Sequence, residues 1–153
     1  MRSRSSLLLT SLCSVLLAAA SPATWAACRV QTLPEGWSAA AVRWEGACIG
    51  DNADGLGILK EQQGSSVKRM FLGRASKGDM LLGVVEEPNQ GFLAGHFQQG
   101  KLPATDERWP AISAFEEAAK AADQAATRFD AEGNKASAQY YRDKAVMLRK
   151  QMD

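Results

Sequence analysis

The sequence predicts an α+β fold, an antiparallel β-meander followed by a C-terminal αα-hairpin. Residues 27–101 are rich in glycine and in short apolar or β-branched runs, which is typical of strands joined by turns. Residues 110–153 are rich in Ala, Glu, Lys, Gln and Arg, which are strong helix formers. A chain of 153 residues, 46% hydrophobic and 23% charged, suits about one globular domain. The chain therefore divides into residues 1–26, a β-meander (27–101), a connector (102–109) and a helical hairpin (110–153).

The first 26 residues have the pattern of a secretory signal peptide. Arg2 and Arg4 give a positive start, residues 7–20 form an apolar stretch, and Thr24-Trp25-Ala26 is a small-x-small exit. A membrane helix is the alternative, but an apolar run interrupted by Ser and Thr is shorter than the ~20 residues that a span needs. We expect a periplasmic or secreted protein with no integral membrane span in its mature chain.

The charge balance argues against a nucleic-acid partner. The full chain has 18 basic and 17 acidic residues. Without Arg2 and Arg4 the basic residues fall to 16, so the mature chain has a formal charge of −1. Neither nucleic acid nor an anionic membrane is electrostatically favoured.

Two cysteines remain once Cys13 leaves with the signal peptide. An even pair in an oxidising compartment predicts a disulfide between Cys28 and Cys48. The alternatives are lipidation of Cys28, because Ala26-Ala27-Cys28 is similar to the end of a lipobox, and a metal site. A lipobox usually has Leu where this chain has Trp25, and two Cys with one distant His lack metal-ligand spacing.

Short apolar runs mark the expected strands. They lie at 41–44, 57–59, 67–72, 80–85 and 91–97. Turn-forming segments separate them at 51–55, 63–66, 77–79 and 88–91. This spacing predicts consecutive hairpins.

The C-terminal region predicts two helices. Pro110 suits a first helical turn, and apolar residues follow at steps of three and four: Ile112, Phe115, Ala119, Ala122, Ala126 and Phe129. Gly133-Asn134 suits a helix end. A second helix, from about 135 to 151, carries a stripe of Tyr141, Ala145, Leu148 and Met152. The short link makes the helices antiparallel, but whether the stripes pack on each other, on the sheet or on a partner is open.

The glycine-rich region contains a weak repeat. The first unit has Trp44, Gly46, Cys48, Asp51, Gly55 and Gly57 at relative positions 1, 3, 5, 8, 12 and 14. Positions 1, 3, 5 and 8 recur at Phe71, Gly73, Ala75 and Gly78, and again at Leu93, Gly95, Phe97 and Gly100. Large residues and glycines at this spacing suit β-hairpins that stack on one another.

This pattern over residues 43–101 resembles a MORN-type repeat array. The resemblance implies stacked hairpins that act as a scaffold or interaction surface, without catalytic residues. It gives a structural role to Trp44, Gly46, Gly55, Gly57, Phe71, Gly73, Gly78, Gly95, Phe97 and Gly100. The second unit lacks the closing Gly-x-Gly, and the third runs into Pro103. Glycine-rich hairpins that fall into register without family relationship are the alternative.

The candidate catalytic groups do not form a known constellation. His96, the single histidine, is expected on a strand and pointing away from the face that buries Phe97. Glu86 and Glu87 are adjacent in a strand and are expected on opposite faces. No nucleophile motif such as Gly-x-Ser-x-Gly accompanies them.

Two further features have structural interpretations. Asp51–Gly55 resembles the start of a calcium loop, but it lacks oxygen ligands at positions 3 and 5 and Glu at position 12, so a hairpin turn is expected. Lys68, Arg69, Arg74 and Lys77 form a basic cluster that would either contact an acidic partner or lie in solvent.

These observations predict an exported, non-catalytic protein-interaction module. It would bind another protein and need no cofactor or metal; a periplasmic binder or inhibitor of an enzyme or toxin is one subtype. The alternatives are a membrane-anchored envelope lipoprotein scaffold, and a small envelope enzyme or ligand-binding domain that uses His96 with Glu86 or Glu87.

Overall fold

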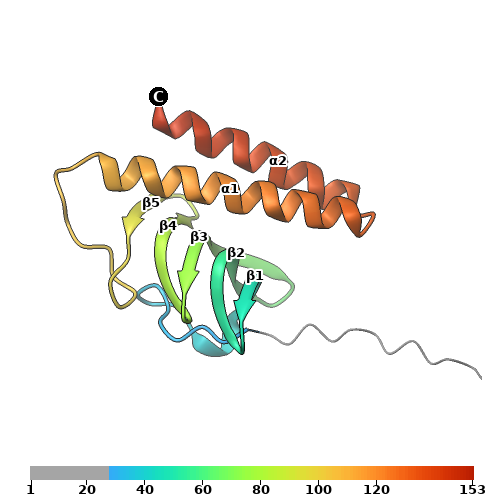
Figure 1. The fold of residues 1–153 in the computed structure, drawn as a ribbon, viewed down its shortest axis with the longest axis horizontal. Coiled ribbons are helices and arrows are strands. Elements are labelled where there is room, and N and C mark those ends of the chain that lie inside the picture. The colour runs from blue at the N-terminus through green and yellow to red at the C-terminus, as the bar shows by residue number, and fades with distance from the viewer. Residues whose placement is uncertain (1–27) are drawn as a thin grey trace, which may run out of the picture.

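The computed structural model describes residues 28–153, so the predicted signal peptide and Ala27 lie outside the described residues. It confirms the predicted class, since a five-stranded antiparallel meander precedes two helices (Figure 1). The strands are β1 (Val42–Ile49), β2 (Asn52–Gln63), β3 (Ser66–Ser76), β4 (Asp79–Glu87) and β5 (Gly91–His96). The helices are α1 (Trp109–Ala131) and α2 (Lys135–Arg149), with short 3-10 turns at Ala39–Ala41 and Lys150–Met152. Strand order in the sheet follows chain order, so β1 and β5 are its edges.

Strands β1 to β4 extend beyond the apolar runs that predicted them, whereas β5 ends one residue before the end of its run. The predicted turn at 51–55 is wrong for its last four residues, because the turn is Gly50–Asp51 and β2 begins at Asn52. Asn52 pairs with Ile49, and the fully buried Ala53 pairs with Cys48. Ala53, a small apolar residue inside the polar segment 51–55, is therefore part of the β1–β2 pairing and of the core.

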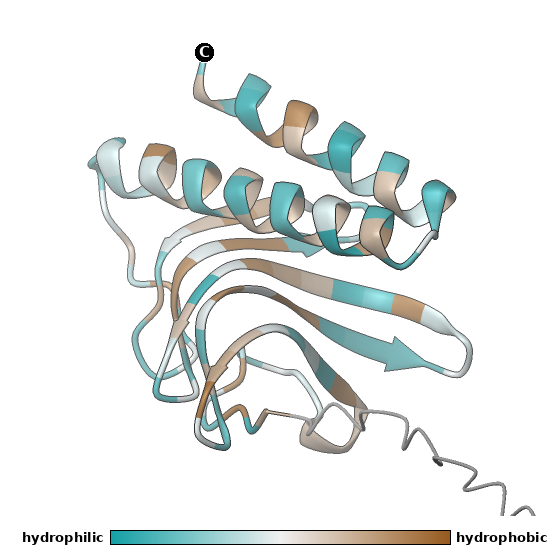
Figure 2. Cartoon of the chain, turned by 45° about the vertical axis from the view of Figure 1, so that its right-hand side comes forward, coloured by the Kyte–Doolittle hydropathy of each residue, from teal (hydrophilic) through white to brown (hydrophobic). Residues whose placement is uncertain are grey.

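Helix α1 lies over the sheet and α2 packs along α1, as Figure 2 shows. Asn134 caps α2, because its side chain accepts a hydrogen bond from the Ser137 backbone N–H. Buried residues from both helices and from the sheet form one core: Ile58, Met70, Leu72, Val84, Ala114, Ala118, Ala119, Ala122, Ala125, Ala126, Tyr141, Ala145 and Leu148. The stripes thus pack on each other and on the sheet, which answers the question that periodicity left open.

The other face of the sheet is covered by residues 28–41, which precede β1. Trp37 belongs to the core on this face, and Val30 and Leu33 pack against it. Backbone hydrogen bonds fix the segment along its length, including Gln31 N–H to Gly78 O at 2.7 Å and Glu35 N–H to Gly100 O at 3.0 Å. The sheet is therefore the middle of three layers.

Cys28 and Cys48 lie at disulfide distance, with their Cα atoms 6.0 Å apart. The pair joins the start of the covering segment to β1 and closes a sequence separation of 20 residues. A disulfided Cys28 would have no thiol left for an acyl chain. This geometry favours the predicted disulfide over lipidation.

A row of glycines, one in each strand, crosses the whole sheet. Cross-strand pairing places Gly46, Gly57, Gly73, Gly83 and Gly95 opposite one another in turn. A Cβ at Gly57 would lie 2.4 Å from the Trp44 ring, and one at Gly83 would lie 2.3 Å from the Leu72 carbonyl oxygen. Close approach of rings and neighbouring backbone therefore requires glycine in this row.

Candidate functional site

Within residues 28–153, strand β5 pairs with β4 and with no other strand, so its outer edge has no strand partner there. The Phe97 N–H donates to Leu81 O at 2.8 Å, so the backbone groups of Phe97 point toward β4. Successive residues of an antiparallel strand point their backbone groups alternately toward and away from the neighbouring strand. In that alternation the backbone N–H and C=O groups of Phe92, Ala94 and His96 point away from β4. Among the described residues, none is hydrogen-bonded to these groups.

A cleft of about 450 Å³ lies beside the end of β5. Its walls are β5, the connector that follows β5 and the first turn of α1. Apolar side chains predominate in the lining, which consists of Ala94, Gly95, His96, Gln98, Leu102, Pro103, Ala104, Thr105, Glu107, Pro110 and Ala111. We call this space the β5 cleft. Its size is within the range of natural ligand pockets.

The two edges of the sheet differ in how they are protected against pairing. β1 carries Arg43 and Glu45 and has an irregular register between Gly46 and Cys48, and both features discourage strand addition. β5 reads Gly-Phe-Leu-Ala-Gly-His, without Lys, Pro or a register shift. Leu93 in this strand is 50% exposed. The β5 strand therefore lacks the charge and the irregular register that discourage pairing at β1.

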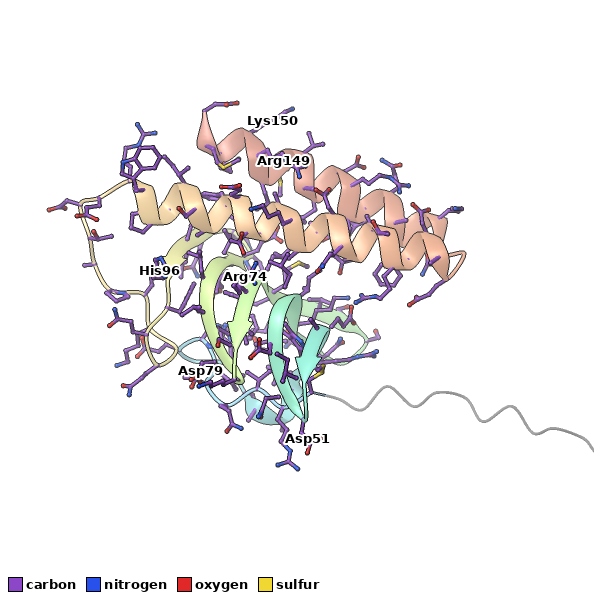
Figure 3. All side chains as sticks on the ribbon, in the orientation of Figure 1. Asp51, Arg74, Asp79, His96, Arg149 and Lys150 are labelled. Carbon is purple, nitrogen blue, oxygen red and sulfur yellow. A yellow bond between two sulfur atoms is a disulfide. The ribbon has the colours of Figure 1, made fainter. Side chains whose placement is uncertain are left out.

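His96 is exposed while Phe97 is buried, as the alternation predicted. It lies nearer to the start of α1 than Asp51 and Asp79 do (Figure 3). His96 pairs with Leu82 and Phe92 pairs with Glu86, so four residues of strand, about 13 Å, separate His96 from Glu86. The structure does not bring His96 together with either glutamate.

Glu86 and Glu87 lie on opposite faces of the sheet and both bind cations. The two carboxylate oxygens of Glu86 accept hydrogen bonds from Lys144 of α2 at 2.8 and 2.7 Å. Glu87 faces the covering segment and lies 3.4 Å from the Arg69 guanidinium. Burial opposes the charge of Lys144, but its bonds to Glu86 outweigh burial and raise the pKa of the ammonium. Both carboxylates therefore hold layers together.

The four residues of the basic cluster do not form one surface. Arg69 packs over the Trp37 ring on one face, while Arg74 binds Glu117 of α1 at 2.7 Å on the other. Lys68 is 3.9 Å from Glu61. Lys77 is in the β3–β4 turn, and its backbone N–H donates to Asp54 at 2.9 Å. Strand positions alternate between the two faces of the sheet, so Arg69 and Arg74 lie on opposite faces. Each of them binds a carboxylate of the chain itself.

A buried ion-pair network that the sequence did not reveal fixes the covering segment. Glu61 is 3% exposed; it accepts the Ser38 backbone N–H at 3.1 Å and the Arg69 Nε–H at 2.6 Å. Arg69 also donates to the Gly36 carbonyl at 2.9 Å. The hydrogen bond from Arg69, opposed by burial, lowers the pKa of Glu61. Charged residues at alternate positions of β2 and β3 could have indicated an ion pair between the strands. The sequence does not give the strand register, which is what places Glu61 opposite Arg69.

A second cluster joins the sheet to the end of α1. Glu45 binds Lys60 at 2.8 Å and Arg128 at 3.2 Å. Lys60 lies 5.4 Å from the centre of the Tyr141 ring. Burial opposes the charge of Lys60, but bonds to Glu45 and Tyr141 raise its pKa. This cluster supports packing of the helical layer.

The described part of the chain, 28–153, brings no three His, Cys, Asp or Glu side chains into a group suited to a metal ion. Neither α1 nor α2 combines the length and hydropathy that crossing a bilayer requires.

Comparisons with protein families, curated proteins and solved structures find no match to this chain.

The glycines and rings of the predicted repeat take structural positions. Gly46, Gly57, Gly73 and Gly95 belong to the row across the sheet. The rings of Phe71 and Phe97 meet edge to face, with centroids 5.6 Å apart. Gly55 is in β2, and Gly78 and Gly100 have positive φ and lie against Gln31 and Leu33 of the covering segment. The relationship to MORN-type arrays stays a prediction.

Proposed function

We propose that the protein is an exported, non-catalytic module that binds another protein through the β5 edge and the β5 cleft. The observation that carries this proposal is the regular edge strand β5, which has outward backbone groups and half-exposed Leu93 beside an apolar cleft. Natural proteins block such edges unless another chain covers them. A periplasmic binder or inhibitor of an enzyme or toxin fits this description.

The arrangement of the ionisable groups supports a binding role. Glu86 and Glu87, which sequence reasoning offered as partners for His96, are engaged by Lys144 and Arg69 on opposite faces. Cys28 and Cys48 are at disulfide distance from each other. Apart from His96, each candidate for acid–base or nucleophilic chemistry therefore has a structural partner within the chain. The backbone N–H and C=O groups on the outer edge of β5, in contrast, point away from the sheet.

Site-specific photocrosslinking tests the proposal. The mature protein carries a photoreactive amino acid at Leu93 in one sample and at Arg43, on the other edge strand, in a matched control. Each is illuminated in periplasmic extract of the cells that make the protein. We expect one discrete crosslinked species from Leu93, which is absent from Arg43 and is competed by excess unlabelled protein. Equal crosslinking at both positions, or none at Leu93, would refute the proposal.

A ligand-binding or enzymatic role for His96 is the second candidate, and one observation favours it. The His96 side chain lines the β5 cleft. A His96→Ala variant separates the two functions, because loss of small-molecule binding with an unchanged Leu93 crosslink would favour the second candidate. We expect the crosslink to be retained, since the backbone of residue 96 is unaffected.

A further inference from the structure

We propose that the β5 cleft takes an extended, largely uncharged segment of the partner, which adds to the sheet as a sixth strand. This inference rests on the proposed function and specifies how the partner is recognised. Strand addition to an exposed sheet edge uses backbone hydrogen bonds for affinity and alternate side chains for specificity.

The hydrogen-bonding groups of β5 match an extended backbone. Phe92, Ala94 and His96 each direct one N–H and one C=O away from β4, at alternate positions along the strand. A β-strand is the element that satisfies such a row, because its own outward groups recur with the same spacing. A docked helix has its backbone groups bonded internally and leaves the row without partners.

The walls of the cleft favour one strand over a second copy of this chain. The connector leaves β5 and runs outside it before it reaches α1 (Figure 1). Leu102 and Pro103 of the connector and Pro110 of α1 line the cleft together with β5, and Leu102 packs against Gly95. A second copy would bring its own connector to the same edge, so the two connectors would obstruct pairing. A single extended segment has no such element.

The charges indicate the chemistry of the segment. Ala94, Leu102 and Pro110 are apolar, and β5 itself carries no acidic or basic side chain other than His96. Glu107 is the one carboxylate in the lining among described residues, and it is exposed. Residues that face these walls should therefore be uncharged, and a basic residue near one end of the segment would complement Glu107.

A random heptapeptide display library is the probe. It is selected on the purified, disulfide-bonded mature protein, in parallel with Ala94→Pro and Ala94→Val. Proline removes the outward N–H of residue 94 without removing a bond to β4, whereas valine adds bulk and keeps the N–H. We expect uncharged peptides with alternating apolar residues to enrich on the wild type, and to bind Ala94→Pro at least tenfold more weakly than Ala94→Val.

Amide hydrogen exchange by NMR on the wild type gives a second test that is independent of the folding of any variant. An enriched peptide should slow exchange at Phe92, Ala94 and His96 at least tenfold. Failure to enrich peptides, equal binding to Ala94→Pro and Ala94→Val, or unchanged exchange at these amides would overturn strand addition. A dimer that Ala94→Pro dissociates would also overturn it, by identifying a second copy as the occupant. A Leu93 crosslink that persists in Ala94→Pro would retain the proposed function while rejecting this mode.

Discussion

Replacement of Glu61 by Gln should loosen the segment that covers one face of the sheet. The carboxylate is 3% exposed and accepts two hydrogen bonds, from the Ser38 N–H and from Arg69. Gln has nearly the same shape, but its amide nitrogen cannot accept a hydrogen bond. Either the Ser38 N–H or the Arg69 Nε–H is therefore left facing another donor. Arg69 keeps its hydrogen bond to the Gly36 carbonyl at 2.9 Å and its contact with Glu87 at 3.4 Å, but its Nε–H bond to residue 61 is weakened or lost.

The expected loss of stability follows from these contacts. A hydrogen bond to a charged group contributes about 1.5–3 kcal/mol, against about 0.5–1.5 kcal/mol for a neutral one. Two such bonds are weakened or lost, so Glu61→Gln should lower the free energy of unfolding by about 3 kcal/mol. With a urea dependence of about 1.5 kcal/mol per molar, the midpoint should fall by about 2 M.

Urea unfolding monitored by tryptophan fluorescence measures this effect, since Trp37 lies beneath Arg69. The pH dependence gives an independent check. Because the folded state lowers the pKa of Glu61 below 4.5, its charge contributes stability that is fully present above pH about 4.5 and is lost as pH falls through the folded pKa. The gap between wild type and Glu61→Gln should therefore be full at pH 7 and shrink below pH about 4.5.

A matched control is available on the helical layer. Glu116→Gln removes an exposed carboxylate, 58% accessible, that pairs with Lys120. We expect no change in the urea midpoint, because exposed pairs of this kind contribute little. A shift for Glu61→Gln no larger than that of Glu116→Gln would refute the assignment of Glu61 as the anchor of the covering segment.

Three further predictions concern how the layers are held. Replacing Cys28 and Cys48 together by Ser should lower the free energy of unfolding by about 3 kcal/mol, the chain-entropy value for a separation of 20 residues; an equal midpoint for both proteins would contradict it. Gly83→Ala should destabilise by about 2 kcal/mol in thermal unfolding, because its Cβ meets backbone, and a neutral effect would show that the sheet tolerates side chains there. Lys144→Met should cost about 2 kcal/mol in urea unfolding by leaving Glu86 unpaired at 29% exposure, while an unchanged midpoint would mean that this pair does not join α2 to the sheet.

Local patterns were sufficient for the class of fold. Short β-branched runs with turn residues predicted consecutive hairpins, and the spacing from Ile112 to Phe129 predicted a helix. The stripe was nevertheless incomplete, because α1 packs on the sheet with one side and on α2 with another. Its buried residues are therefore seven alanines over a broader arc, at positions 114, 118, 119, 121, 122, 125 and 126.

The site depended on information that no local pattern carries. Glu61 finds Arg69 through the register of β2 and β3, and Glu45 finds Arg128 across 83 residues of sequence. The basic cluster looked continuous in the sequence, but alternation sent Arg69 and Arg74 to opposite faces. Whether β5 was an edge or a central strand could not be read from its six residues. That distinction, which decides whether Ala94 has a backbone partner, comes from the topology.

The amide exchange rate at Ala94 shows whether the partner binds at the β5 edge. We predict fast exchange in the free protein and slow exchange in the complex with its crosslinked partner, while Gly95, whose backbone faces β4, is protected in both states. Slow exchange at Ala94 in the free protein, or exchange that the partner leaves unchanged, would contradict binding at the β5 edge.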